Sequence, residues 1–348
     1  MSRPLPLSTS FEIPAPPPEP RLPSAIYALR ELPGVGRAVQ ALIARQMAQR
    51  EQRYRNLLAI LRARLAELLT AEQSTLAEEQ PDPAACLRLA TAAPERLWHR
   101  PAADLLLRVG SAARPSNLTV VAPSKLDPSH ADPLIQAAQA LAATAACLPE
   151  APVCITLYGS CAVRGPRPQV LDTARALLVQ LATHYAPQHL PVAIVFDAAE
   201  QDAWRWARWL PHVQTADGRR RLAWDAATAA LAVADSSVAL LADAGLGTAL
   251  PAGARRVYLL AEGAGVPEDC AAVLDVDSTL AGTLHIVGDR PVRVDRIDGA
   301  CLELAERLAR ALYGRTATPS TAGDGIVEVH LDGTRTSFGA GSLQHGRP

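Results

Sequence analysis

The residues with the clearest potential for chemistry follow a short apolar segment, Cys161–Arg164, and precede a helical pattern. Gly165 opens the turn between them, and Arg167 supplies a positive charge. In nucleotide-binding α/β proteins a glycine turn at this place holds phosphate, because backbone N–H groups and the helix N-terminus attract anions. A second apolar run, Ser237–Asp243, ends in an acid, as does the strand that holds Mg²⁺ in such proteins. Gly165, Arg167 and Asp243 are therefore the candidates for a nucleotide site.

The turn lacks the groups that a working phosphate loop needs. Such a loop has the pattern Gly-x-x-x-x-Gly-Lys-Ser/Thr, in which the lysine reaches the β- and γ-phosphates. Here Pro166 and Pro168 provide no N–H, and neither Lys nor Ser/Thr opens the helix. Asp172, expected in the first helical turn, would disfavour an anion, and the single lysine, Lys125, has no glycine loop. We predict a degenerate site that hydrolyses nothing.

Other catalytic patterns are missing from the sequence. Ala244 stands where a catalytic glutamate would follow Asp243, and the eight histidines are scattered. The six cysteines form no C-x-x-C pair and no cluster with zinc-ligand spacing. We therefore expect no catalytic residue, metal or cofactor. Two alternatives stay open: a nucleotide sensor that binds through Gly165 and Asp243 without hydrolysis, and an unrelated Rossmann-like enzyme.

The elements that must position these residues alternate between strands and helices from residue 81 to 313. This alternation predicts an α/β domain with a mainly parallel sheet flanked by helices, a degenerate P-loop or Rossmann-like fold. Gly159-Ser160 lies between two strand-like segments and predicts a hairpin there. Helix 169–185 is expected to bury one face against the sheet. Helices are also expected at 131–148 and 199–210.

Segments with other compositions flank this domain. Residues 1–35 contain nine prolines and are expected to be extended or disordered, without burying a core. Apolar residues at spacings of three and four predict a long amphipathic stalk helix over 36–80. Residues 314–348 form a flexible tail with one possible strand at 326–331.

Two features favour contacts with other proteins. Residues 36–64 hold seven arginines and one glutamate, which indicates either a solvated helix face or a surface for a partner or an anionic membrane. Arg45, Arg50 and Arg53 are the candidates for that contact. Trp204 lies off the helix face shared by its neighbouring tryptophans, so it either packs in the core or anchors a partner.

The overall composition excludes several classes. The formal net charge is −1, and the arginine-rich stalk lacks interleaved aromatic residues, so no nucleic-acid role is expected. No signal peptide is visible, and the longest apolar-looking run is too short and polar to span a membrane. Cysteines spread through apolar segments indicate a reduced, cytoplasmic protein.

Taken together, residues from about 50 to about 313 resemble the FtsK/SpoIIIE-type ATPase of type VII secretion, the EccC/EssC family. The similarity lies in the following segments: Pro81–Leu89, Arg96–Gly110, Ala174–Pro187, Leu190–Val195, Trp206–His212 and Leu302–Leu312. The most specific segment is Trp206–His212, which is similar to the family's Trp-x-x-Trp-Leu-Pro-His.

The resemblance implies a degenerate ATPase-like domain between a membrane stalk and true motor modules. It implies a non-catalytic scaffold or regulatory component of protein export, whose partners are an FtsK-type motor or membrane subunits of the secretion machine. The implied location is cytoplasmic, at the inner face of the membrane. The sequence departs from the family pattern, because residues 24–37 are charged where transmembrane helices are expected and no intact Walker motif follows.

Overall fold

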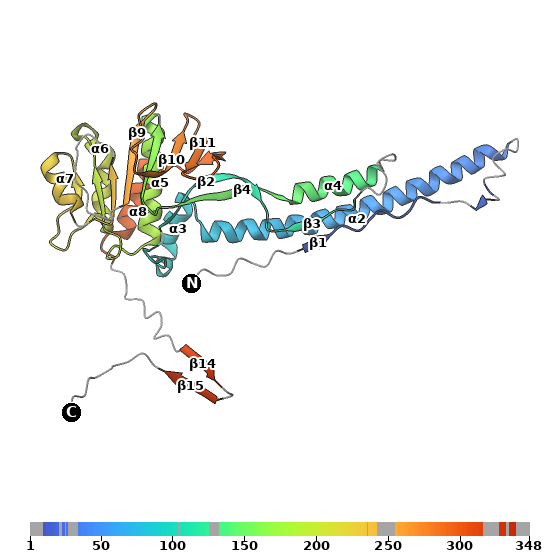
Figure 1. Cartoon of the computed structure of the whole chain (residues 1–348), viewed down its shortest axis with the longest axis horizontal. Coiled ribbons are helices and arrows are strands. Elements are labelled where there is room, and N and C mark those ends of the chain that lie inside the picture. Colours follow the sequence, from blue (N-terminus) through green and yellow to red (C-terminus); the bar gives the residue numbers. More distant parts are fainter. Residues whose placement is uncertain are drawn as a thin grey trace.

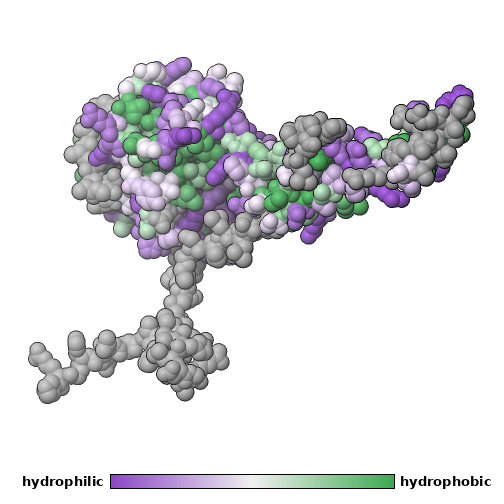
Figure 2. All heavy atoms as spheres, turned by 45° about the vertical axis from the view of Figure 1, so that its right-hand side comes forward, coloured by the Kyte–Doolittle hydropathy of each residue, from purple (hydrophilic) through white to green (hydrophobic). Residues whose placement is uncertain are grey.

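The computed structural model describes most of the chain. It covers residues 10–20, 23–24, 26, 34–103, 105–124, 132–234, 236–241, 255–315, 327–331 and 334–338. A long helical arm extends from a body that contains both helices and strands (Figure 1). Apolar surface gathers at the base of the arm and on the body, between hydrophilic side chains (Figure 2). Among the described helices, none combines the length and the apolar character needed to cross a membrane.

The arm is built on α2 (Val35–Glu79), a helix of 45 residues. Its apolar stripe packs against α4 (Pro133–Ala145), and the two share a small core separate from that of the body. Asp132 caps α4 by accepting a hydrogen bond from the Leu134 N–H at 2.9 Å. The helix ends at Ala145 rather than near 148, because the chain enters strand β4 at Cys147.

Residues 10–20 of the proline-rich N-terminal segment are extended, but the prediction that the segment buries no core residue is wrong. Strand β1 (Ser10–Glu12) pairs in parallel with β3 (Thr119–Val121) along the arm. Ile13 is almost fully buried in the core of the arm. The Tyr54 hydroxyl donates a hydrogen bond to the Pro14 carbonyl at 2.8 Å. Strand pairing, one buried isoleucine and a hydrogen bond from the arm therefore dock this polar segment on α2 and β3.

The body contains a sheet of eight strands in the order β12-β11-β10-β5-β9-β8-β6-β7. Its strands are β5 (Ser160–Gly165), β6 (Val192–Val195), β7 (Leu222–Ala223), β8 (Val238–Leu241), β9 (Arg255–Ala261), β10 (Cys270–Val276), β11 (Gly282–Ile286) and β12 (Val292–Val294). The six from β10 to β7 are parallel, and β11 and β12 add antiparallel strands at one edge. The fold is thus mixed α/β, and the expected predominance of parallel strands holds for this sheet.

A second sheet is antiparallel and has the order β13-β2-β4. It consists of β2 (Leu106–Pro115), β4 (Cys147–Thr156) and β13 (Arg296–Ile297). The predicted hairpin across Gly159-Ser160 is therefore wrong: β4 pairs with β2, whereas β5 pairs with β9 and β10. The turn between β4 and β5 carries the chain from one sheet to the other.

Helix α5 (Arg167–His184) lies between the large sheet and β2. The prediction that it buries one face is too narrow, since all residues from 173 to 186 are buried. Helices α3 (Pro83–Ala92) and α8 (Leu302–Leu312) cover its remaining sides. A helix enclosed in this way keeps polar residues only where they find partners.

The other helical segments of the body are short. The helix expected over 199–210 is divided into α6 (Gln201–Trp204) and a 3₁₀ segment, Arg205–Trp209. Helix α7 (Ala226–Val233) packs on the opposite face of the sheet, capped by Asp225. Further along, β14 (Val327–Leu331) and β15 (Thr334–Phe338) form an antiparallel pair.

Candidate functional site

The turn from β5 to α5 is the first candidate site, and a close backbone contact fills it. Gly165 ends β5 between its neighbours β9 and β10. In open α/β sheets, ligands bind at the carboxyl ends of strands, in a crevice where neighbouring connections diverge. Here a Cβ on Gly165 would lie 2.3 Å from the Val276 carbonyl oxygen of β10. The glycine is needed for strand packing, so β10 closes the space at this turn.

Arg167 is committed to a partner within the chain. Its Nε lies 2.6 Å from Oε1 of Glu200, and its second nitrogen contacts the other carboxylate oxygen. Both side chains are only partly exposed, which strengthens a bidentate ion pair relative to one in open water. A phosphate group at this turn would have to displace Glu200. The arginine therefore provides no free positive charge at the helix start.

The start of α5 offers few other donors for an anion. Pro166 is the N-cap residue, no side chain caps the helix, and Pro168 lacks an N–H. Asp172 lies in the second turn, not in the first as predicted, because the helix begins at Arg167. It pairs with Arg175, whose NH1 lies 2.6 Å from Oδ1. Burial lowers the pKa of Arg175, and Asp172 partly offsets this effect.

The third predicted residue of the site cannot be placed beside the other two. Strand β8 ends at Leu241, and Asp243 lies outside the described residues. Within the part of the chain that the structure describes, no three His, Cys, Asp or Glu side chains are grouped as metal ligands. Gly165 and Arg167 thus share one turn, and both are occupied by structural contacts.

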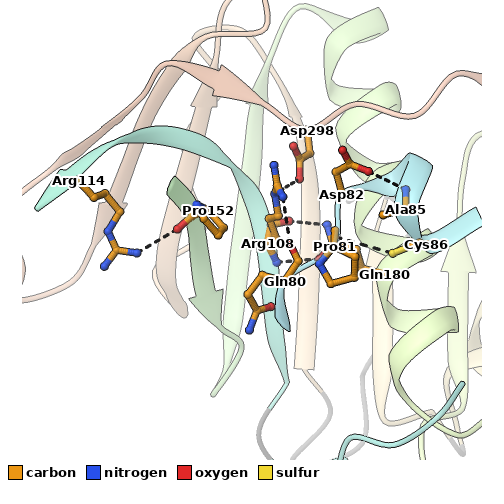
Figure 3. A network of polar contacts seen from close by, with 10 residues as sticks. All are labelled: Gln80, Pro81, Asp82, Ala85, Cys86, Arg108, Arg114, Pro152, Gln180 and Asp298. Carbon is orange, nitrogen blue, oxygen red and sulfur yellow. Dashed lines mark hydrogen bonds and ion pairs between the residues drawn. The ribbon is translucent and has the colours of Figure 1, made fainter. Parts of the chain in front are cut away.

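A second candidate lies where the arm meets the body, around Arg108 of β2 (Figure 3). Its Nε lies 2.9 Å from Oδ2 of Asp298, and both side chains are less than a tenth exposed. Its NH1 donates a hydrogen bond to the Gln80 carbonyl at 3.0 Å, just past the end of α2. The side chain of Gln180 in α5 accepts from the Arg108 N–H and donates to its carbonyl. One residue thus connects the arm, the small sheet, α5 and the segment before α8.

Burial shifts the pKa values of two ionisable groups at this junction. Burial raises the pKa of Asp298 to about 6, although the nearby Arg108 acts in the opposite direction. Cys86 of α3 also lies at the junction, and burial raises the pKa of its thiol to about 12, so it is no nucleophile at neutral pH. An open cavity of about 390 Å³ lies beside the junction, between the end of α2 and α3. Acidic and basic side chains both line it.

The residues predicted to contact partners have different environments. Trp204 is fully buried and stacks on Phe196 with ring centroids 6.3 Å apart, so its prediction as a partner anchor is wrong. Arg50 links three segments of the arm, because its guanidinium donates hydrogen bonds from α2 to the Pro17 carbonyl and the Asp132 carboxylate. Its role as a free contact is therefore also wrong. Arg45 and Arg53 are exposed on α2.

Sequence reasoning missed Glu200, which pairs with Arg167 at the first candidate site, and Arg108, which is the centre of the second. Glu200 carries no sequence signal, since it follows the next strand and meets Arg167 only in the folded chain. Arg108 did carry one: a charged residue interrupts the apolar segment Leu105–Val109. Buried charges are rarely tolerated without partners, so this arginine predicts a buried acid elsewhere in the chain.

Comparisons with known proteins link the chain to one group of secretion proteins. No protein-family model matches it. The ESX-4 secretion system protein EccC4 of Mycobacterium tuberculosis is 32% identical over 167 residues, which is 46% of this chain and 13% of that protein. EccC3 of the ESX-3 system in the same species is 27% identical over 166 residues, 46% of this chain and 12% of that protein.

A shorter match is the ESX-5 protein EccC5 of that species, 41% identical over 59 residues, or 17% of this chain and 4% of that protein. The similarity thus covers about half of the chain at modest identity. It covers about an eighth or less of the length of these relatives. The chain contains a region related to EccC proteins of type VII secretion systems.

Proposed function

We propose that this protein is a non-catalytic scaffold or regulatory component of type VII secretion, in which a degenerate ATPase-like domain and its arm hold other components together. The observation that carries the proposal is the filled turn after β5. Val276 fills the space beside Gly165, and Glu200 forms an ion pair with Arg167. The similarity to EccC proteins supports the secretion context.

The way in which the arm is attached also supports a scaffold. Arg108 ties the end of α2 to the body through buried contacts, so the arm is held at its base. A helix of 45 residues extends for about 68 Å at 1.5 Å per residue. A rigid element of that length suits a spacer between components. The proposed partners are an FtsK-type motor or membrane subunits of the secretion machine, at the cytoplasmic face of the membrane.

Nucleotide binding gives the direct test of the non-catalytic part. The full chain is assayed for phosphate release from Mg-ATP and for a ligand-induced rise in melting temperature. We expect neither phosphate release nor a rise in melting temperature, because the turn after β5 is filled. The melting temperature reports binding, since a ligand that binds only the folded state must stabilise it. A rise in melting temperature without hydrolysis would favour the nucleotide-sensor alternative. Hydrolysis that is lost in an Arg167→Ala variant would overturn the proposal.

The secretion context needs a separate experiment. The full chain is cross-linked in its own host with a photoactivatable residue at exposed Arg53 of the arm, and the products are identified by mass spectrometry. A matched probe replaces exposed Arg290 on the body, in the turn between β11 and β12. Cross-links to an FtsK-type motor or a secretion membrane subunit support the proposal. Products confined to proteins with no part in secretion contradict it.

A further inference from the structure

A cluster of arginine and aromatic side chains lies on the body, and none of its residues belongs to either candidate site. We name it the Trp209 patch: Arg208, Trp209, Arg220, Arg310 and Tyr313. The guanidinium carbons of Arg208 and Arg310 lie 4.9 and 4.8 Å from the centre of the Trp209 ring. The Tyr313 ring meets the same indole edge-on, with centroids 5.1 Å apart. Residues far apart in the chain, on a 3₁₀ segment and on α8, thus converge on one ring.

The patch carries an excess of positive charge. Arg310 donates to the Glu306 carboxylate at 3.0 and 2.7 Å. Within the part of the chain that the structure describes, Arg220 bonds three backbone carbonyls, those of Arg208, Gly218 and Arg219, and no carboxylate. Arg208 is exposed, and its guanidinium meets no carboxylate among the described residues. Three guanidinium groups therefore face one carboxylate, whereas many other arginines in the described parts of the chain are individually paired.

Stacking prepares these arginines to bind an anion. A guanidinium that lies over an indole is held in place while its in-plane N–H groups stay directed outward. A carboxylate matches this fork with two parallel hydrogen bonds. Because the orientation is already fixed, less side-chain entropy is lost on binding. Tryptophan, tyrosine and arginine are also the residues most enriched at the energetic centres of protein interfaces.

We propose that the Trp209 patch is a docking surface for an acidic segment of a partner protein. The proposal rests on the scaffold role, since a scaffold needs a surface that holds a partner. Charge complementarity identifies the occupant as a peptide rich in Glu or Asp. A nucleic acid fits less well, because stacking on bases needs an open aromatic face. Here guanidinium groups and Tyr313 already pack against the indole.

The test uses a fluorescently labelled hexaglutamate peptide, blocked at both ends, and the full chain at low ionic strength. Fluorescence anisotropy measures its binding to the wild-type chain and to two variants. Arg208→Glu reverses the exposed charge of the patch. Arg290→Glu makes the same charge change in the exposed turn between β11 and β12 and serves as the matched control. Hexaglutamine and a six-nucleotide thymidine strand, labelled in the same way, are the control ligands.

We expect hexaglutamate to bind and hexaglutamine not to bind. Arg208→Glu should weaken binding by at least about tenfold, the effect of losing one hydrogen bond to a charged group, while Arg290→Glu leaves it unchanged. Equal losses in both variants would show that net charge alone attracts the peptide and would overturn the proposal. Tighter binding of the thymidine strand would overturn it in favour of a nucleic acid. None of these outcomes alters the nucleotide or cross-linking results, so failure here leaves the scaffold role standing.

Discussion

Replacement of Gly165 by alanine tests whether the turn after β5 is closed, as the scaffold role requires. The added Cβ would lie 2.3 Å from the Val276 carbonyl oxygen and 3.2 Å from its carbonyl carbon. Contacts of a Cβ below 3.0 Å are essentially unknown, so one backbone must move by at least about 0.7 Å. Neither atom belongs to a flexible side chain that could rotate away. The strand register between β5 and β10 must absorb the shift.

The cost follows from this geometry. Overpacking of a well-packed interior costs about 1–3 kcal/mol, and a backbone clash belongs in the upper half of that range. A movement of β10 also disturbs the pair of Arg164 with Asp275, whose nitrogen–oxygen distances are 2.7 and 2.9 Å across the same two strands. For a domain of this size, a loss of about 2–3 kcal/mol lowers the melting temperature by roughly 4–12 °C.

Gly159→Ala supplies the matched control. Gly159 lies in the turn just before β5, and a Cβ there would meet nothing within 4 Å. Its free energy of unfolding should change by less than about 0.5 kcal/mol. Thermal and urea denaturation of both variants measure the difference. Equal stability of Gly165→Ala and Gly159→Ala would refute the reasoning, because the turn would then have room that a ligand could also use.

Two further predictions concern buried charges. Arg108→Met or Asp298→Leu alone should cost about 3–5 kcal/mol by leaving the other charge buried without its partner, whereas the double variant should recover much of that loss in urea denaturation. Additive losses would contradict a direct pair. Burial also lowers the pKa of His212 to about 4, so between pH 6.5 and 4 the unfolded chain holds the extra proton and the folded state loses about 1.4 kcal/mol per pH unit. His212→Gln keeps a donor for the Tyr185 carbonyl and should remove this part of the decline, measured as the stability difference from wild type at each pH.

The sequence predicts most elements of the body, because their periods are clear. The long helix follows from apolar spacing, and α5 follows from a strand-to-helix change at Gly165. What the sequence does not contain is which strand lies beside which. The turn at Gly159-Ser160 has the residues of a hairpin, but β4 and β5 belong to different sheets. Pairing of β4 with β2, some forty residues earlier, is a tertiary choice that local propensity does not encode.

For the candidate sites too, some features follow from residue type and others only from the fold. Prolines at 166 and 168 already predict a poor phosphate loop, since the missing N–H groups are a property of the residue type. The role of Glu200 depends on where the segment after β6 returns, and only the fold shows that. For Trp204 the sequence left core packing and a partner anchor open, because the residue lies off one predicted helix face. The helix breaks after Trp204, and the ring is buried against Phe196, so only the fold decides between them.

The contacts of Arg108 fix the position of the arm relative to the body. Its backbone pairs with the side chain of Gln180 in α5, and its guanidinium pairs with Asp298 and with the end of the arm. A buried arginine costs desolvation energy that a hydrophobic residue would avoid, so it is poorly suited to stability alone. What it does provide is a fixed angle, because each partner lies on a different element. The arm is then held relative to α5, and a component bound along α2 would be held relative to one bound on the body.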